Sequence, residues 1–102
     1  MDEKDPKYVL RLFIQRSTPR ATLAINNLRK LTAKYLSSID FEVIDVNEQP
    51  AEAERHRILA TPTLLKLSPP PVRRIIGDLT DLDKVVIGLD LPIQPVSTED
   101  LL

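Results

Sequence analysis

The side chains that could carry out chemistry are few, and the most reactive type is missing. The 102 residues contain no cysteine and a single histidine, His56. The absence of cysteine excludes thiol catalysis, disulfides and cysteine-based zinc sites. Arg55 and Arg57 flank the histidine and would repel a metal cation. We therefore interpret His56 as an exposed helix residue without a catalytic or metal-binding role.

The carboxylates do not form a recognisable acid–base pair or metal site. Asp78, Asp81 and Asp83 lie close together, but they lack the glycine and the twelfth-position glutamate of a calcium loop, so we interpret them as helix-capping residues. Glu52 and Glu54 are two positions apart and diverge on a helix. With only two glycines, the chain also lacks a phosphate-binding loop. These patterns predict a protein that is not an enzyme and that has no metal site and no cofactor.

The composition is that of one small globular domain. Hydrophobic residues make up 42% and charged residues 28% of the chain, with a net charge of −1. A nucleic-acid-binding domain would normally carry a basic surplus, and two tyrosines and two phenylalanines are too few for a base-stacking platform. No apolar run approaches the ~18 residues of a membrane span. The first residues, MDEKDPK, lack the apolar core of a secretory signal, and we expect a cytoplasmic protein.

The most informative stretch is ILATPTLLKLSPPPVRRIIGDL, residues 58–79. Thr61-Pro62-Thr63 followed by an apolar run resembles the loop that carries a cis-proline into a central strand of thioredoxin-like proteins. In the redox enzymes of that superfamily the loop faces a Cys-x-x-Cys pair, which this chain lacks. We predict a structural cis bond before Pro62. Residues 69–71 are three consecutive prolines without an N–H, so they must leave regular hydrogen bonding.

Arg73 and Arg74 are candidates for recognising carboxylates on a partner. Guanidinium groups bind carboxylates through two parallel hydrogen bonds. A solvated sheet edge without a role explains the same pair, and spacing alone does not decide between the two interpretations.

The first half of the chain predicts a βαβ unit. Residues 8–14 form a strand with apolar side chains on both faces, which is typical of a central position in a sheet. Thr18 and Pro19 then start a helix, as a hydroxyl cap followed by proline at the first helical position. We expect the helix to end at residues 37–38 and a second, parallel strand to cover residues 41–46.

The second half gives conflicting signals. We predict a short helix over residues 50–57, a strand over 63–67 and an edge strand over 72–76. Residues 80–83 resemble a capping box that starts with Thr80. Yet residues 84–91 are β-branched and contain Gly88, as a strand would. Such conflicts are expected at functional or strained sites. We assign residues 7–91 to the domain, and residues 1–6 and 92–102 to an N-terminal and a flexible C-terminal tail.

Four segments together resemble the KaiB family of circadian clock proteins. They are residues 43–46, 58–64, 70–79 and 84–91, and the run PVRRIIGD is the most specific of them. The resemblance implies an α/β fold of the thioredoxin-like superfamily that can switch its C-terminal half. It implies a tetrameric ground state of order βαββααβ and a monomeric alternative state of order βαβαββα, which binds the ATPase KaiC. We expect a homo-oligomer, a tetramer or dimer, in the ground-state order, in which the β-branched residues 85–87 lie in a sheet.

The same resemblance implies a regulatory protein that binds a KaiC-like ATPase and modulates its phosphorylation and ATPase state. KaiA or a clock-linked histidine kinase pathway would be further partners. The implied partner-binding residues are Lys66, Arg73, Arg74 and Asp78. The implied fold-switch residues are Tyr8, Pro62, Pro70, Pro71, Gly88 and Asp90.

The chain departs from the family pattern in two places. Residues 15–17 read Gln-Arg-Ser where the family usually has Ala-Gly-Asn, and residues 92–95 replace a tyrosine-containing segment. These departures indicate a divergent member or paralogue. Two alternatives stay open: a redox-inactive thioredoxin-like adapter for another protein, for example in stress response or signalling, and a thiol-independent enzyme of the glutathione-binding group.

Overall fold

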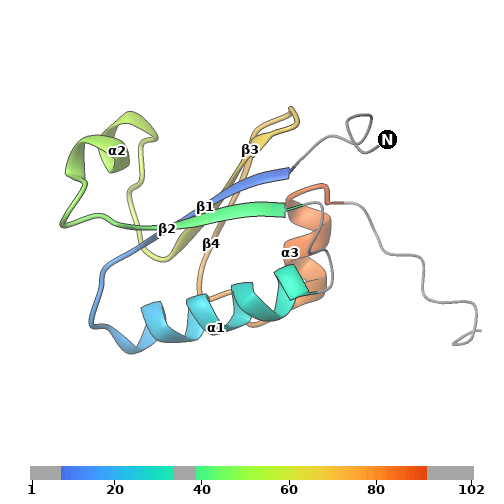
Figure 1. The fold of residues 1–102 in the computed structure, drawn as a ribbon, viewed down its shortest axis with the longest axis horizontal. Helices are drawn as coiled ribbons and strands as arrows, with labels where there is room; N and C mark the ends of the chain where they lie inside the picture. Colours follow the sequence, from blue (N-terminus) through green and yellow to red (C-terminus); the bar gives the residue numbers. More distant parts are fainter. Residues whose placement is uncertain (1–7, 34–38, 92–102) are drawn as a thin grey trace, which may run out of the picture.

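Seven elements follow one another in the order βαβαββα. The computed structural model describes residues 8–33 and 39–91, so the predicted tails lie outside the described residues (Figure 1). The elements are β1 (Tyr8–Ile14), α1 (Pro19–Ala33), β2 (Ile39–Asp45), α2 (Pro50–Arg55), β3 (Thr63–Ser68), β4 (Arg73–Ile76) and α3 (Leu82–Gly88). This is the second of the two orders that the resemblance implies, and not the ground-state order that we expected. The expected tetramer stays a prediction.

The four strands form one sheet in the order β2-β1-β3-β4. β1 and β2 are parallel, whereas β3 is antiparallel to both β1 and β4. The parallel β1–α1–β2 unit is therefore confirmed, and so is the edge position of β4. β1 lies in the interior of the sheet because it pairs on both sides.

The two faces of β1 enter two separate hydrophobic clusters. Leu10, Leu12 and Ile14 pack with residues of α1 and α3, whereas Phe13 packs with Ile44 and Leu65 on the other face. Figure 1 shows α1 and α3 below the sheet and α2 above it. The alternation of side chains along the strand thus places a core on each side, as the sequence pattern predicts.

α1 begins as the sequence pattern predicts. The Thr18 hydroxyl accepts a hydrogen bond from the Ala21 amide at 3.1 Å, and Pro19 is the first helical residue. Its described part ends at Ala33, and the predicted end at residues 37–38 lies outside the described residues.

α3 decides the conflict at residues 80–91 in favour of a helix. The cap is Asp81, whose carboxylate accepts a hydrogen bond from the Lys84 amide at 3.2 Å, so the prediction of Thr80 as the cap is wrong. The β-branched Val85 and the following Leu89 are buried in the core below the sheet. Burial of this apolar stripe overrides the strand preference of the segment, because propensity is the weaker term.

The remaining predicted boundaries differ from the observed ones by only a few residues. α2 ends at Arg55 rather than at residue 57, and Arg57 has a positive φ of 55° that no helix can contain. The Thr61–Pro62 bond is cis, as predicted, and the bonds before Pro69 and Pro71 are cis as well. Within the described ranges, no helix has the length and apolar character needed to cross a bilayer.

Candidate partner-binding site

Three connections meet at one end of the sheet. Thr63 pairs with Phe13 on β1 and with Ile76 on β4, so the segments after β1, before β3 and after β4 lie next to one another. The Gly77 amide donates to the Pro62 carbonyl at 2.9 Å and joins two of these segments. We call residues 15–18, 59–62 and 77–78 the Pro62 surface.

Asp78 is held in this surface from below and from within its own loop. Asn27 of α1 is 7% exposed, and its side-chain amide donates to the Asp78 carbonyl at 2.9 Å. The Thr80 hydroxyl and amide both donate to the Asp78 carboxylate. The hydroxyl lowers the pKa of Asp78 below its ordinary value of 3.8, and the Arg20 guanidinium acts in the same direction. Asp78 is thus a fixed negative charge at neutral pH.

The segment after β1 is also fixed, but by charges. The Arg16 side chain lies 3.5 Å from the Asp45 carboxylate and 3.5 Å from that of Glu48. Asp45 is buried and also accepts a hydrogen bond from the Asn47 amide at 2.9 Å. This arginine therefore ties the loop before α1 to the end of β2.

The Pro62 surface contains no group that could act as a nucleophile next to a base. Its described polar side chains are those of Gln15, Arg16, Ser17, Thr18, Thr61 and Asp78. The Thr18 hydroxyl is occupied in capping α1, and no histidine lies among these residues. No cluster of three or more potential metal ligands occurs among the described residues. Such a surface can recognise a partner by shape and charge.

Lys66 lies away from this surface and is not accessible. It is 1% exposed, and its ammonium group lies 5.9 Å from the centre of the Tyr8 ring. A cation over a tyrosine ring at this distance is attracted to it. In this arrangement the buried Lys66 side chain cannot contact a partner directly, contrary to the role that the resemblance implies. The contact between Lys66 and Tyr8 instead joins β3 to β1.

The two arginines of β4 differ in their contacts. Arg73 is exposed and lies opposite Lys66 in the strand register. Arg74 donates to the His56 carbonyl at 2.8 Å and to the Arg57 carbonyl at 3.1 Å. Arg74 thus has an intramolecular role in addition to its candidate role in partner binding.

The interpretation of His56 as an exposed helix residue is wrong, because His56 is half-buried and follows the last residue of α2. Its side chain is 22% exposed and its Nε2 lies 3.6 Å from a Glu52 carboxylate oxygen. Its ring centre lies 5.7 Å from that of Phe13. The spacing of four residues between Glu52 and His56 is the sequence signal for this contact.

Apart from Tyr8, the implied fold-switch residues occupy three separate places. Pro62 is buried at the Pro62 surface, whereas Pro70 and Pro71 form the exposed turn between β3 and β4 at the opposite end of the sheet. Gly88 ends α3 beside β4: a Cβ at this position would lie 2.8 Å from Ile75 Cδ1. Asp90 follows the helix with a positive φ of 59°.

The backbone after α3 closes a Schellman motif. The Asp90 amide donates to the Ile87 carbonyl and the Leu91 amide to the Val86 carbonyl. Glycine is the usual residue at the position that Asp90 occupies, because it adopts a positive φ without strain.

The fold defines a protein of the thioredoxin-like class. The mitochondrial thioredoxin 3 of Saccharomyces cerevisiae superposes with a TM-score of 0.70 at 21% identity, over 82% of this chain and 77% of that one. The N-terminal domain of Synechococcus elongatus SasA superposes with a TM-score of 0.67 at 26% identity, over 86% of this chain and 88% of that domain.

Sequence similarity defines the family within this class. The KaiB domain model matches residues 11–91. A circadian clock oscillator protein KaiB from Prochlorococcus marinus (strain MIT 9515) is 47% identical over 95 residues, which is 92% of this chain and 88% of that protein. One from Nostoc sp. (strain PCC 7120) is 44% identical over 101 residues, 98% of this chain and 94% of that protein. The chain belongs to the KaiB family.

Proposed function

We propose that this protein is a non-enzymatic clock-type regulator that binds a KaiC-family ATPase and modulates its phosphorylation and ATPase state. Family membership supports the regulatory role, because the relatives are named circadian clock oscillator proteins. KaiA and a clock-linked histidine kinase pathway are further partners in this proposal. The SasA N-terminal domain, which shares the fold, supports clock-related partners.

The observation that carries this proposal is the Pro62 surface. The segment beside the Pro62 loop holds Gln15, Arg16 and Ser17 and contains no cysteine. The loops around it are nevertheless held firmly, by the hydrogen bond from Gly77 to Pro62 and by that from Asn27 to Asp78. An ordered surface without a reactive group is suited to binding, because loops held in one conformation lose little entropy when a partner docks.

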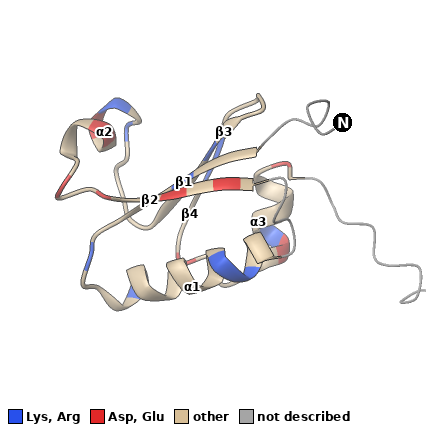
Figure 2. Ribbon diagram, in the orientation of Figure 1, with Lys and Arg blue, Asp and Glu red and all other residues tan. Residues whose placement is uncertain are grey.

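Charged side chains of both signs are available for this partner. Arg73 is exposed on the edge strand and supplies a positive charge. The Asp78 carboxylate supplies a negative charge at the Pro62 surface. Figure 2 shows basic residues on β3, on β4 and at the end of α2, and acidic residues on β2. In this proposal Arg73 and Asp78 contact the partner directly. Arg74 also contacts the partner, and in addition it holds the end of α2 through its two hydrogen bonds.

Fold switching is the second part of the proposal. The observed order βαβαββα would be the binding-competent arrangement, and the strand preference of residues 84–91 supports a second packing of the same segment. Two packings can coexist when their free energies differ by a few kcal/mol. Tyr8, Pro62, Pro70, Pro71, Gly88 and Asp90 are the positions expected to bias this equilibrium.

Binding to an immobilised KaiC-family ATPase in the presence of ATP tests the proposal. The variant Arg73→Glu should weaken binding about tenfold or more, since it reverses a charge in the interface. Arg29→Glu makes the same charge change on the exposed face of α1 and should bind as the wild type does. Absence of wild-type binding would favour the redox-inactive adapter, and equal loss in both variants would exclude a specific contact at Arg73.

A further inference from the structure

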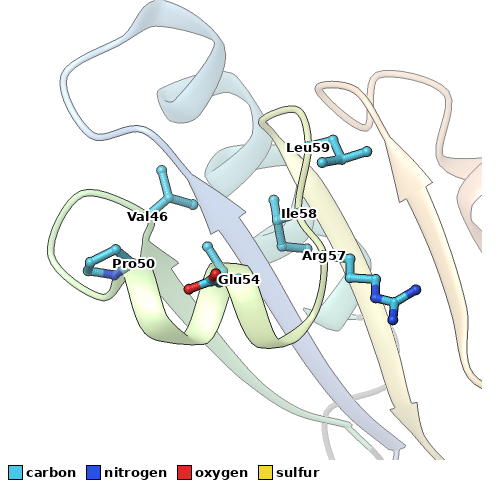
Figure 3. Close-up of a pocket in the computed structure, with 7 residues that line it drawn as sticks. Val46, Pro50, Glu54, Arg57, Ile58 and Leu59 are labelled. Carbon is cyan, nitrogen blue, oxygen red and sulfur yellow. The ribbon is translucent and has the colours of Figure 1, made fainter.

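Two hollows lie against different faces of α2. The first has a volume of about 510 Å³ and is bordered by apolar side chains such as Val46, Ile58 and Leu59 (Figure 3). The second has a volume of about 340 Å³ and lies between α2 and the sheet. Its lining is mainly charged, and charges specify a ligand more closely than apolar walls do. We call this second hollow the α2 cleft.

The α2 cleft is formed by side chains from three strands and from α2 with its flanking residues. Its sheet side consists of Arg11 of β1, Glu42 and Ile44 of β2, and Leu67 of β3. Its helix side consists of Gln49, Glu52, Arg55 and His56. Two acids and two arginines thus line one cleft, and two apolar side chains of the sheet complete it.

The charges on the helix side are occupied by one another. The Glu52 carboxylate accepts two hydrogen bonds from Arg55 Nη2, at 2.9 and 3.1 Å. One of its oxygens also lies 3.6 Å from His56 Nε2. Both oxygens of Glu52 are therefore already in use.

The charge pair on the sheet side leaves part of its capacity unused. Arg11 and Glu42 lie opposite each other in the register of β1 and β2, and Arg11 Nε lies 3.2 Å from one Glu42 oxygen. Arg11 Nη1 donates to the Leu10 carbonyl at 3.0 Å. Within residues 8–33 and 39–91, Arg11 Nη2 donates no hydrogen bond and the Glu42 carboxylate accepts none. A guanidinium has five N–H donors and a carboxylate about four acceptor sites, so both groups can take up a further partner.

We propose that the α2 cleft binds a small zwitterion of the α-amino-acid class. The carboxylate of this ligand would accept a hydrogen bond from Arg11 Nη2, and its ammonium group would donate to the Glu42 carboxylate. Its side chain would lie on Ile44 and Leu67. The two charged groups of an α-amino acid are attached to one carbon atom, so they match a pair of opposite charges that are themselves in contact.

The balance of charge in the cleft disfavours a ligand with a single charge. Arg11 and Arg55 balance Glu42 and Glu52, so an anion or a cation alone would meet a like charge next to its partner. The Arg11 side chain is only 25% exposed, and its contact with a carboxylate would be partly shielded from water. The volume of about 340 Å³ lies at the lower end of the range for small-molecule sites, which agrees with a ligand of few atoms. Because few atoms make few contacts, we expect a dissociation constant on the order of 1 mM.

Three compounds with the same side chain test the charge requirement. At a pH of about 6, L-leucine carries both charges, N-acetyl-L-leucine only the negative one and L-leucinamide only the positive one. Each is titrated into the full chain, up to about 50 mM, and followed by the amide shifts in NMR. Leucine should saturate the shifts, and the other two compounds should have dissociation constants at least about tenfold higher. The shifts should map to residues 11, 42–44, 49–56 and 67.

Two matched variants locate the ammonium group of the ligand. Glu42→Gln should weaken the binding of leucine at least about fivefold, because it removes the charge that faces the ammonium group. The same variant should bind N-acetyl-L-leucine at least as well as the wild type does, because it also removes a like charge. Asp40→Asn makes the same change at an exposed position of β2 outside the cleft and should bind leucine as the wild type does. Far-UV circular dichroism verifies that both variants are folded.

Four outcomes would each overturn the proposal. They are no saturation with leucine up to about 50 mM, similar constants for the three compounds, shifts that map outside the cleft, and equal effects of Glu42→Gln and Asp40→Asn. None of them bears on the proposed function, because the α2 cleft and the Pro62 surface have no residue in common.

Discussion

Arg73 and Arg74 are neighbours in the sequence but point to opposite faces of the sheet. Along a strand, successive side chains alternate. Arg74 therefore reaches the α2 side, where its guanidinium donates to the carbonyls of His56 and Arg57. These carbonyls follow the last turn of α2, where a helix leaves its acceptors unsatisfied. One arginine thus fastens a helix end, while the other is exposed on the edge strand.

Replacing each arginine by alanine should separate these roles. We expect Arg74→Ala to lower the free energy of unfolding by about 1 kcal/mol, the typical net contribution of such hydrogen bonds. Arg73→Ala should change it by less than about 0.5 kcal/mol, as is usual for exposed positions. Urea denaturation monitored by circular dichroism gives both values. Equal effects of the two substitutions would contradict the assignment.

Asp78 offers a test of the Pro62 surface through its pKa. Thr80→Val removes the hydroxyl that donates to the carboxylate, so the pKa of Asp78 should rise toward its ordinary value of 3.8. Thr80→Ser keeps the hydroxyl and should keep the lowered pKa. The side-chain carbon shift of Asp78, followed by NMR from neutral pH to well below 3.8, reports it.

The sign of the accompanying stability change follows from linkage. A carboxylate whose pKa is lower in the folded state stabilises that state above the unfolded pKa, and this stabilisation disappears as the pH falls through the folded pKa. The difference in stability between Thr80→Ser and Thr80→Val should therefore be largest at pH values above 3.8 and shrink below it. A difference that is independent of pH would point to a purely steric role of Thr80.

At the scale of elements, the last residue of α3 lies so close to β4 that a larger side chain there would meet Ile75. A Cβ at Gly88 would lie 2.8 Å from Ile75 Cδ1 and 3.3 Å from Ile75 Cγ1. Alanine favours a helix over glycine by about 1 kcal/mol, but here the isoleucine side chain must move to accept it. The gain from helix propensity and the packing cost therefore oppose each other.

A double-mutant cycle should resolve this opposition. Ile75→Val removes Cδ1, so Gly88→Ala should stabilise the protein more in the valine background than in the wild type. We expect a coupling free energy of about 0.5–1 kcal/mol between the two sites, as is found for residues in contact. Additive effects in thermal denaturation would show that Ile75 does not restrict position 88.

How far the sequence predicts this architecture depends on whether the signals are local. The two-faced β1, the Thr18 cap and the edge position of β4 follow from periodicity, capping chemistry and residue order, and all three are confirmed. The burial of Lys66 did not follow, because it depends on the register that sets β3 beside Tyr8. The same holds for Asn27, whose acceptor lies 51 positions away in the chain.

The candidate site shows the same limit. The Thr61-Pro62-Thr63 pattern predicted the loop and its cis bond, which the structure confirms. Its neighbours could not be predicted, because they come from three connections that only the sheet brings together. The exposure of Leu59, which is 94%, has no sequence signature either, because an exposed leucine and a buried one look alike in a short apolar run.

At the scale of the whole molecule, the proposed switch makes binding depend on the population of the βαβαββα arrangement. A ligand that binds one of two states has its apparent affinity reduced by the fraction of that state. A substitution of Asp90 should change this fraction, because Asp90 has a positive φ of 59° at the end of α3 in the observed arrangement. In the proposed switch, we expect the positive φ of Asp90 to be confined to the observed arrangement.

Asp90→Gly should therefore favour the observed arrangement by about 0.5–1 kcal/mol, because glycine adopts a positive φ without a steric penalty. Glycine also adds freedom to the unfolded chain, but this term cancels when two folded states are compared. The competent population, and with it the apparent affinity for the KaiC-family ATPase, should rise about two- to fivefold. Asp83→Gly, in the first turn of α3, is the opposite control, since glycine there weakens the helix and should lower the affinity.

Mixing with increasing concentrations of the ATPase distinguishes switching from rigid docking. If the binding-competent arrangement must form from a second one before binding, the observed rate should level off at high partner concentration, because switching becomes limiting. Asp90→Gly and Asp83→Gly should then move the apparent affinity in opposite directions. A rate that rises linearly with partner over the whole range, together with equal affinities for both variants, would mean that the protein binds as a rigid adapter with one fold.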